Sequence, residues 1–168
     1  YHGINHCEWD SGTEPCLVEE ASGVITVSSG LSIDGDDFDD PTVFTHIDLS
    51  GLASVPDKMR QRGFPNVARI NFGPLEVGED LKIGNMSSVL NIEYAGATTE
   101  EVDISDMPNL VSASFPNAGP TSLEFENCPS LASVSAPDLV PRPWGCSSWI
   151  RDGDFNMTAD EVQTYMSE

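Results

Sequence analysis

The sequence predicts a mainly β fold: a right-handed parallel β-solenoid of about four 21-residue coils, with capping segments and a short C-terminal helix. The stretch VDISDMPNLVSASFP at residues 102–116 repeats as LEFENCPSLASVSAP at residues 123–137, at a constant offset of 21 residues. Each repeat holds two short tracts of alternating apolar and polar residues, the pattern of strands with one buried face. A strand–turn–strand unit of this size cannot bury its apolar face alone, so successive units must stack.

Residues 1–45 are the predicted N-terminal capping segment. The tract 23–33, GVITVSSGLSI, holds two alternating segments that we expect to form the strands that begin the stack. Terminal repeats of a solenoid are atypical because they shield the open end of the core.

An acidic stretch, DGDDFDD, closes this first segment. Ca²⁺ takes six to eight oxygen ligands and favours clustered carboxylates on a flexible loop. One interpretation is a calcium site, and the other is a solvated acidic loop without a metal. The candidate ligands are Asp34, Asp36, Asp37, Asp39 and Asp40.

Residues 46–140 are the predicted repeat solenoid. The first apolar tracts of three repeats begin at Leu81, Val102 and Leu123, and turn sequences separate them from the second tracts. The second tracts contain Ile92, Ala113 and Val134, and prolines 108, 116, 129 and 137 lie between tracts, as expected at corners.

The earliest coil is less regular in sequence. We expect Ile47-Asp48-Leu49 to correspond to Leu81-Lys82-Ile83, separated from it by an insertion. The stretch VPDKMRQRG, residues 55–63, lies in that insertion and is expected to form a short helix ended by Gly63.

The repeated phrase resembles known repeat families. The residues LVSASFPN…LEFENCPSLASVSAPDL resemble leucine-rich repeats of the BspA type, and they are similar to receptor L-domain repeats of fungal cell-wall proteins and receptor ectodomains. The resemblance covers roughly residues 47–140. It implies a surface or secreted binding or scaffold module without catalytic machinery.

Residues 141–168 are the predicted C-terminal cap with its short helix. The stretch DGDFNMTADEV, residues 152–162, resembles the second half of an EF-hand loop, which implies Asp152, Asp154 and Glu161 as calcium ligands. Phe155 stands where that loop needs glycine for its sharp turn. The alternative is a capped helix in which Thr158 and Glu161 form a capping box.

The four cysteines and two glycosylation acceptors indicate a secretory destination. No two cysteines form a CxxC pair, and four cysteines allow three disulfide connectivities. We favour Cys7–Cys16 and Cys128–Cys146, because each pair would seal one end of the domain. The sequons at Asn85 and Asn156 favour the same extracellular or cell-surface location.

The formal net charge of −21 restricts the partners of the chain. Such an excess of carboxylates repels phosphate backbones and anionic membranes, so nucleic acid is not expected as a partner. No stretch approaches 18 consecutive apolar residues, so we expect no transmembrane segment. Protein partners, self-assembly and glycans remain as candidates.

The sequence offers only weak candidates for a catalytic site. His2, His6 and His46 are the only histidines, no G-x-S-x-G elbow is present, and no Asp cluster recurs at one strand position across coils. We therefore expect no enzyme, with a carbohydrate-active enzyme as the third alternative.

The leading expectation is an extracellular structural or adhesive scaffold module of a surface, matrix, wall or filament, with Ca²⁺ as a candidate bridge. The alternative is a ligand-binding receptor ectodomain fragment that recognises protein or glycan on the solenoid face. Outward strand residues would then carry recognition: Lys82, Asp103 and Glu124 on one face, and Glu93, Ser114 and Ser135 on the other.

Overall fold

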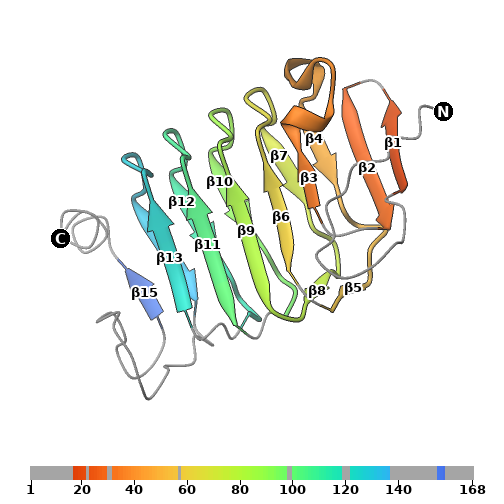
Figure 1. Ribbon diagram of the computed structural model, residues 1–168. Coiled ribbons are helices and arrows are strands. Elements are labelled where there is room, and N and C mark those ends of the chain that lie inside the picture. The colour runs from red at the N-terminus through yellow and green to blue at the C-terminus, as the bar shows by residue number, and fades with distance from the viewer. Residues whose placement is uncertain are drawn as a thin grey trace.

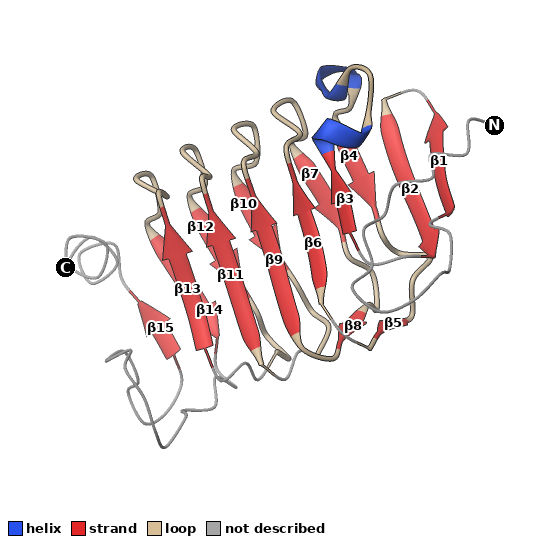
Figure 2. Ribbon diagram, in the orientation of Figure 1, coloured by secondary structure: helices blue, strands red, loops and turns tan. Residues whose placement is uncertain are grey.

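Short parallel strands stack into a β-solenoid with two long faces, as the computed structural model of the chain shows (Figure 1). The structure describes residues 17–21, 23–29, 32–56, 58–97, 100–118, 122–136 and 155–157. Strands dominate these residues, and the helical segments among them are two short 3₁₀ turns (Figure 2). The predicted mainly β solenoid is therefore confirmed.

One face is a five-stranded, fully parallel sheet. Its order is β13-β11-β9-β6-β3, so each coil adds one strand next to the previous one. Val102 lies between Leu81 and Leu123 in register, which confirms the predicted 21-residue offset. The strands are β3 (Ser32–Asp34), β6 (Met59–Arg62), β9 (Asp80–Gly84), β11 (Glu101–Ser105) and β13 (Ser122–Glu126).

The opposite face is divided into two four-stranded sheets. In the first, with order β1-β2-β4-β7, only β1 runs antiparallel to its neighbour. In the second, with order β10-β12-β14-β15, only β15 does. The strands are β1 (Leu17–Ala21), β2 (Val24–Ser29), β4 (His46–Asp48), β7 (Arg69–Asn71), β10 (Asn91–Glu93), β12 (Ser112–Ser114), β14 (Ser133–Ala136) and β15 (Phe155–Met157).

The two antiparallel strands lie at opposite ends of the stack (Figure 1). An added strand pairs with the backbone groups of a terminal strand that would otherwise be open to another chain. β1 at one end and β15 at the other therefore act as caps on this face. A two-stranded ladder of β5 (Ser54–Val55) and β8 (Glu76–Val77) lies along one edge.

The expected helix at residues 55–63 is wrong, because this tract carries β6. Met59 and Gln61 point inward and are fully buried, while Arg60 and Arg62 point outward. β6 pairs with β9 so that Met59 lies beside Leu81. The predicted correspondence of Ile47 with Leu81 is therefore also wrong, since Ile47 pairs with Ile70 on the opposite face.

The core consists of columns in which equivalent residues of successive coils touch. One column on the β7–β10–β12 side is aromatic-rich, and in it the rings of Phe72 and Tyr94 meet edge to face at 5.3 Å. The Tyr94 hydroxyl donates to the carbonyl of Ala97 at 2.6 Å and accepts from the N–H of Val77 at 3.1 Å. These bonds satisfy the one polar atom of an otherwise apolar ring.

Three phenylalanines near the beginning of the stack close the core there. The rings of Phe38, Phe44 and Phe64 lie 5.0–6.1 Å apart, in edge-to-face pairs. Phe38 and Phe44 belong to the segment with the 3₁₀ turns Gly35–Asp37 and Pro41–Val43. The region before residue 46 thus contributes two buried rings to the core, and its capping role stays a prediction.

At the same corner of four successive coils, the chain turns through one residue in the left-handed backbone conformation. Asn85, Asp106 and Asn127 have φ between 51° and 53°, and Gly63 has φ of 82°. Asn, Asp and Gly are the residues that adopt this conformation at least cost. Asn127 also donates through its side-chain nitrogen to a carboxylate oxygen of Asp106 at 2.8 Å, which links adjacent corners.

Side-chain hydrogen bonds join the turn after this corner to the previous coil. The donor lies in the turn of one coil and the acceptor is a carbonyl of the coil before it, at 2.6–2.7 Å. The pairs are Asn66 to Thr42, Ser88 to Pro65, Asn109 to Ser87 and Ser130 to Pro108. The prolines at 108, 116 and 129 lie outside strands, as predicted for corners.

Candidate binding site on the five-stranded sheet

The outer surface of the five-stranded sheet carries two polar columns. Strand alternation places residues two apart on this surface, and the parallel register aligns them across coils. One column contains Arg60, Lys82, Asp103 and Glu124, and the other contains Asp34, Arg62, Gly84, Ser105 and Glu126. Positive side chains lie on β6 and β9, and negative side chains lie on β3, β11 and β13.

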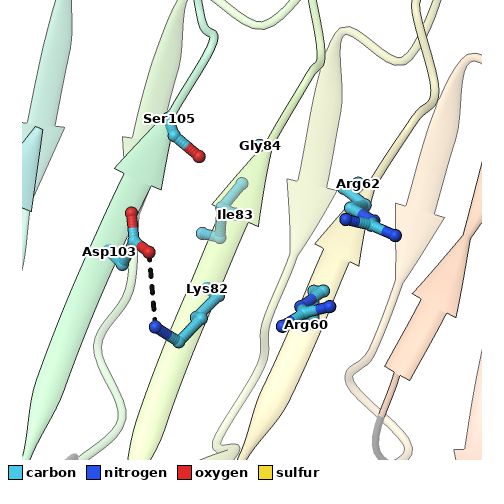
Figure 3. A pocket seen from close by; sticks show the side chains of 7 residues that line it. All are labelled: Arg60, Arg62, Lys82, Ile83, Gly84, Asp103 and Ser105. Atoms are coloured by element: carbon cyan, nitrogen blue, oxygen red, sulfur yellow. Dashed lines mark hydrogen bonds and ion pairs between the residues drawn. The ribbon is translucent and has the colours of Figure 1, made fainter. Parts of the chain in front are cut away.

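A hollow of about 200 Å³ opens among the cations on this surface. It spans β6, β9 and β11, and its lining residues are Arg60, Arg62, Lys82, Ile83, Gly84, Asp103 and Ser105 (Figure 3). The Ile83 side chain is buried in the core, so this residue lines the hollow with its backbone. Three of the chain's seven Lys and Arg residues thus lie around one hollow.

Gly84 creates the hollow because it is the one position of its column without a side chain. Arg62 and Ser105 are its neighbours in register on β6 and β11. A Cβ atom at residue 84 would lie 2.9 Å from the Ser105 hydroxyl oxygen and 3.0 Å from its carbonyl oxygen. Any larger residue would therefore press on β11 and fill the space between Arg62 and Ser105.

Two of the three cations are held by carboxylates at the rim. The Lys82 ammonium lies 3.0 Å from Glu101. It also lies 3.3 Å from Asp103, on the β11 side (Figure 3). Partial burial acts to lower the pKa of Lys82, but the hydrogen bond and charge of Glu101 and the charge of Asp103 raise it overall. Arg62 donates through Nε to Asp34 on the β3 side.

Arg60 differs from Arg62 and Lys82 in its charge partners. Its side chain is exposed, and within the part of the chain that the structure describes it forms no ion pair. Its neighbour in register on β9 is Lys82, a residue of the same charge. The Arg60 guanidinium therefore offers five N–H donors toward solvent beside the hollow.

The site can bind and orient a negative group. Ser105 contributes a hydroxyl on one wall, and the cations contribute charge and donors on the other. The described residues around the hollow include no histidine or cysteine that would serve as a base or nucleophile beside Ser105. The groups present can form charge-assisted hydrogen bonds to a bound anion.

The predicted recognition residues lie where expected. Lys82, Asp103 and Glu124 share one outer column of the five-stranded sheet, and Glu93, Ser114 and Ser135 align across β10, β12 and β14. Arg60, Arg62, Gly84 and Ser105 were missed. A 22-residue offset that aligns Met59 with Leu81 would have revealed them, because it also aligns Arg60 with Lys82 and Arg62 with Gly84.

The acidic loop is held by local hydrogen bonds. Asp34 accepts from the N–H of Asp36 and binds Arg62, and Asp37 accepts from the N–H of Asp34. The hydroxyl and the N–H of Thr42 bind Asp40 and hold its pKa below its usual value. Within the described ranges, no three His, Cys, Asp or Glu side chains are arranged to hold a metal ion.

The second predicted calcium segment lies almost wholly outside the described residues. Of residues 152–162, the structure describes the backbone of Phe155–Met157, which forms β15 beside β14. Asp152, Asp154 and Glu161 are not among the described residues, and neither is the predicted C-terminal helix. The calcium sites stay predictions.

Cys128 is a free, fully buried thiol in this structure. It lies in the core column of Met86 and Met107, and its Sγ donates to the carbonyl of Glu126 at 3.3 Å. Burial raises the pKa of this thiol, which keeps it protonated. Cys7, Cys16 and Cys146 lie outside the described residues, so the pairings proposed from sequence stay predictions.

The predicted glycosylation acceptor Asn85 is exposed, at one of the left-handed corners. Ser87 of the same sequon donates to the carbonyl of Pro65 at 3.1 Å. Nothing in the described structure covers the Asn85 side chain, so a glycan has access to it. The side chain of Asn156 is outside the described part.

The histidines form no site in the described structure. His46 is exposed, and its Nδ1 lies 2.9 Å from the Thr45 hydroxyl, on the face opposite the hollow. His2 and His6 lie outside the described residues.

No family model, curated protein or solved structure matches the chain. The class that the fold defines is therefore taken from the structure itself, a parallel β-solenoid of about five coils. Among the described residues, no helix is long and apolar enough to cross a membrane.

Proposed function

We propose that the chain is an extracellular structural and adhesive scaffold module of the leucine-rich-repeat or receptor L-domain type. Its adhesive surface would be the outer face of the five-stranded sheet. The observation that carries the proposal is the cation-lined hollow on that face, in a chain whose formal net charge is −21. Carboxylates pair with Lys82 and Arg62, so Arg60 is the cation that would attract a negative partner locally while the acidic surface elsewhere repels it.

The stacked architecture supports a scaffold role. Each coil is joined to the next by strand pairing, by core columns and by side-chain bonds between turns. A solenoid built in this way holds surface groups at fixed spacings on an extended face, which suits repeated contact with a partner.

The extracellular location is supported by residues that the secretory pathway would use. The Asn85 sequon lies on an exposed corner, which an oligosaccharide requires. The cysteine count and the second sequon favour the same location.

The experiment measures binding to purified extracellular polymers. Immobilised protein is presented with acidic polysaccharides, with neutral polysaccharides and with a fibrous matrix protein, and binding is followed by interferometry. We expect saturable binding to acidic polymers that Arg60→Glu weakens at least tenfold. The matched control is Arg69→Glu, which makes the same charge change at an exposed residue on the opposite face.

Equal binding by Arg60→Glu and Arg69→Glu would show that the adhesive surface lies elsewhere, and no binding to any polymer class would remove the adhesive role. Release of soluble sugar products from a polysaccharide would replace the scaffold proposal with an enzymatic one.

The second candidate is a receptor ectodomain fragment that binds one discrete ligand. The small volume of the hollow favours it, because about 200 Å³ admits a chemical group and not a long chain segment. One-to-one saturable binding to a single partner, with no affinity for repetitive polymers, would favour this candidate.

A further inference from the structure

We infer that the hollow on β6, β9 and β11 is a binding site for a tetrahedral oxyanion, either a free phosphate or sulfate ion or the monoester of one on a larger molecule. This inference shares with the proposed function only the location of the binding surface, the outer face of the five-stranded sheet. It adds the chemical class of the group that is recognised.

The donors surround the hollow from two sides. On β6, Arg60 and Arg62 are two residues apart and both point outward. On β11, the Ser105 hydroxyl faces them across Gly84 (Figure 3). Lys82 on β9 lies between the two walls, so a group in the hollow meets donors on several sides.

The number and spread of donors favour a tetrahedral anion over a planar carboxylate. One Arg fork is enough to bind both oxygens of a carboxylate in a plane. Here two guanidinium groups, one ammonium and one hydroxyl line the same small space, together with the Asp103 carboxylate, which is paired with the ammonium. Phosphate and sulfate have oxygens pointing in four directions, so they can accept from donors on different strands at once.

Gly84 supplies the floor. With no side chain at this position, the Ser105 hydroxyl lies close over Gly84, 2.9 Å from where a Cβ atom would be, and it can turn toward the hollow. The neighbouring coils place Arg62 and Ser105 at the equivalent positions, so the position without a side chain lies between two polar side chains.

The carboxylates hold two of the cations, and one of them, Asp103, itself lines the hollow on the β11 side. Glu101 and Asp103 hold the Lys82 ammonium from the β11 side, and Asp34 holds Arg62 from the β3 side. Arg60 is left to bind the incoming anion, because it forms no ion pair with any described residue.

The acidic background gives the site an unusual dependence on ionic strength. The net charge of −21 repels an approaching anion over long distances, and salt screens this repulsion. The contacts within the hollow are short and are screened less. We therefore expect phosphate affinity to rise or stay constant between about 20 and 150 mM sodium chloride, whereas ordinary polyanion sites weaken with salt.

The test is a titration of ¹⁵N-labelled protein with sodium phosphate and sodium sulfate at constant ionic strength, followed by amide chemical shifts. Saturable shifts should be confined to residues around 60–62, 82–84 and 103–105. Arg60→Gln should lower the association constant about tenfold, Ser105→Ala by a smaller factor, and the matched control Arg69→Gln should leave it unchanged. Both Arg60 and Arg69 are exposed, so neither change threatens the fold.

Methyl phosphate and methyl sulfate separate the two sources of the anion. Monoester binding as tight as that of the free ions supports a group carried on a larger molecule, and binding of the free ions alone supports a free anion.

The inference is overturned if shifts do not saturate by 50 mM of either ion, if they map to the opposite face, or if Arg60→Gln binds like the wild type. It is also overturned if acetate binds as tightly as phosphate. Polymer binding that depends on Arg60 but is not competed by phosphate or sulfate would keep the proposed function and reject the oxyanion site.

Discussion

Replacing Gln61 should stabilise the protein. Gln61 lies on β6 between Arg60 and Arg62, but its side chain points into the core and is fully buried. Neither its amide nitrogen nor its amide oxygen has a hydrogen-bond partner. Its neighbours in register are Ile33 on β3 and Ile83 on β9, so a polar amide occupies a column of isoleucines.

The magnitude follows from two opposing effects. Burying polar atoms without a partner costs about 1–3 kcal/mol in protein mutational data. Exchanging the side chain for an unbranched apolar one of similar volume costs less than about 1.5 kcal/mol in packing. Gln61→Met should therefore increase the free energy of unfolding by about 1–2 kcal/mol. For a domain of this length, that corresponds to a rise in Tm of about 2–8 °C.

The assay is equilibrium urea unfolding, followed by both fluorescence and far-UV circular dichroism. Coincident transitions by the two probes are needed before a single free energy is assigned. Ile83→Met is the matched control, because it makes a methionine in the same column one coil later and relieves no buried amide. It should destabilise by less than about 1.5 kcal/mol.

A loss of 1 kcal/mol or more in Gln61→Met, with Ile83→Met close to neutral, would refute the reasoning, since it would mean that the Gln61 amide is satisfied in solution. Gln61→Glu gives an independent check. A carboxylate at this buried position should destabilise strongly near pH 7 and much less at pH 4, where it is protonated.

Tyr94→Phe should lower stability at pH 7 by about 0.5–1.5 kcal/mol, because the hydroxyl bonds Ala97 and Val77. Burial raises the pKa of Tyr94, so the stability that its protonated hydroxyl contributes is present below the unfolded pKa of about 10 and is lost as the pH rises above that value. The wild type should therefore lose more stability than Tyr94→Phe between pH 9 and 11. Parallel losses in the two proteins would contradict this. Asn85→Val should be about 1–2 kcal/mol less stable than Asn85→Gly in unglycosylated protein, because φ at this corner is 51°; equal stabilities would show that the corner relaxes. In a chain whose other three cysteines are changed to serine, Cys128 should react with a thiol reagent at pH 8 only after urea is added; rapid labelling of the folded chain would show that the thiol is accessible.

The regular part of the solenoid could be predicted because its columns are apolar in every coil. Val102 and Leu123 are both apolar and occupy the same place in successive repeats, so one offset was enough to place both strands. The strand of the earlier coil was not predicted, because β6 has the sequence Met-Arg-Gln-Arg. These residues favour helices, and the strand places a polar side chain in the core. Pairing with β9 overrides that preference, since strand formation depends mainly on neighbouring strands.

The candidate site was harder to predict for a related reason. Lys82 and Asp103 were recognised as outward residues from the alternation alone. The hollow, however, depends on a difference between coils, namely glycine at residue 84 between Arg62 and Ser105. A search for repeated residues cannot detect a feature that occurs once, and the correct register of β6 was needed before Arg60 could be placed beside Lys82.

The near-constant strand spacing also bears on how the chain folds. Parallel partners in this protein are only 21 to 28 residues apart, as in the pairs Val102–Leu123, Ile47–Ile70 and Asp34–Arg62. For 168 residues, the commonest spacing of 21 is a relative separation of about 0.13, lower than the relative contact orders near 0.16–0.22 that are typical of all-β domains. Closing each successive coil costs similar loop entropy, so a folded pair of coils can extend one coil at a time in either direction. We therefore expect folding within milliseconds, which is fast for an all-β chain.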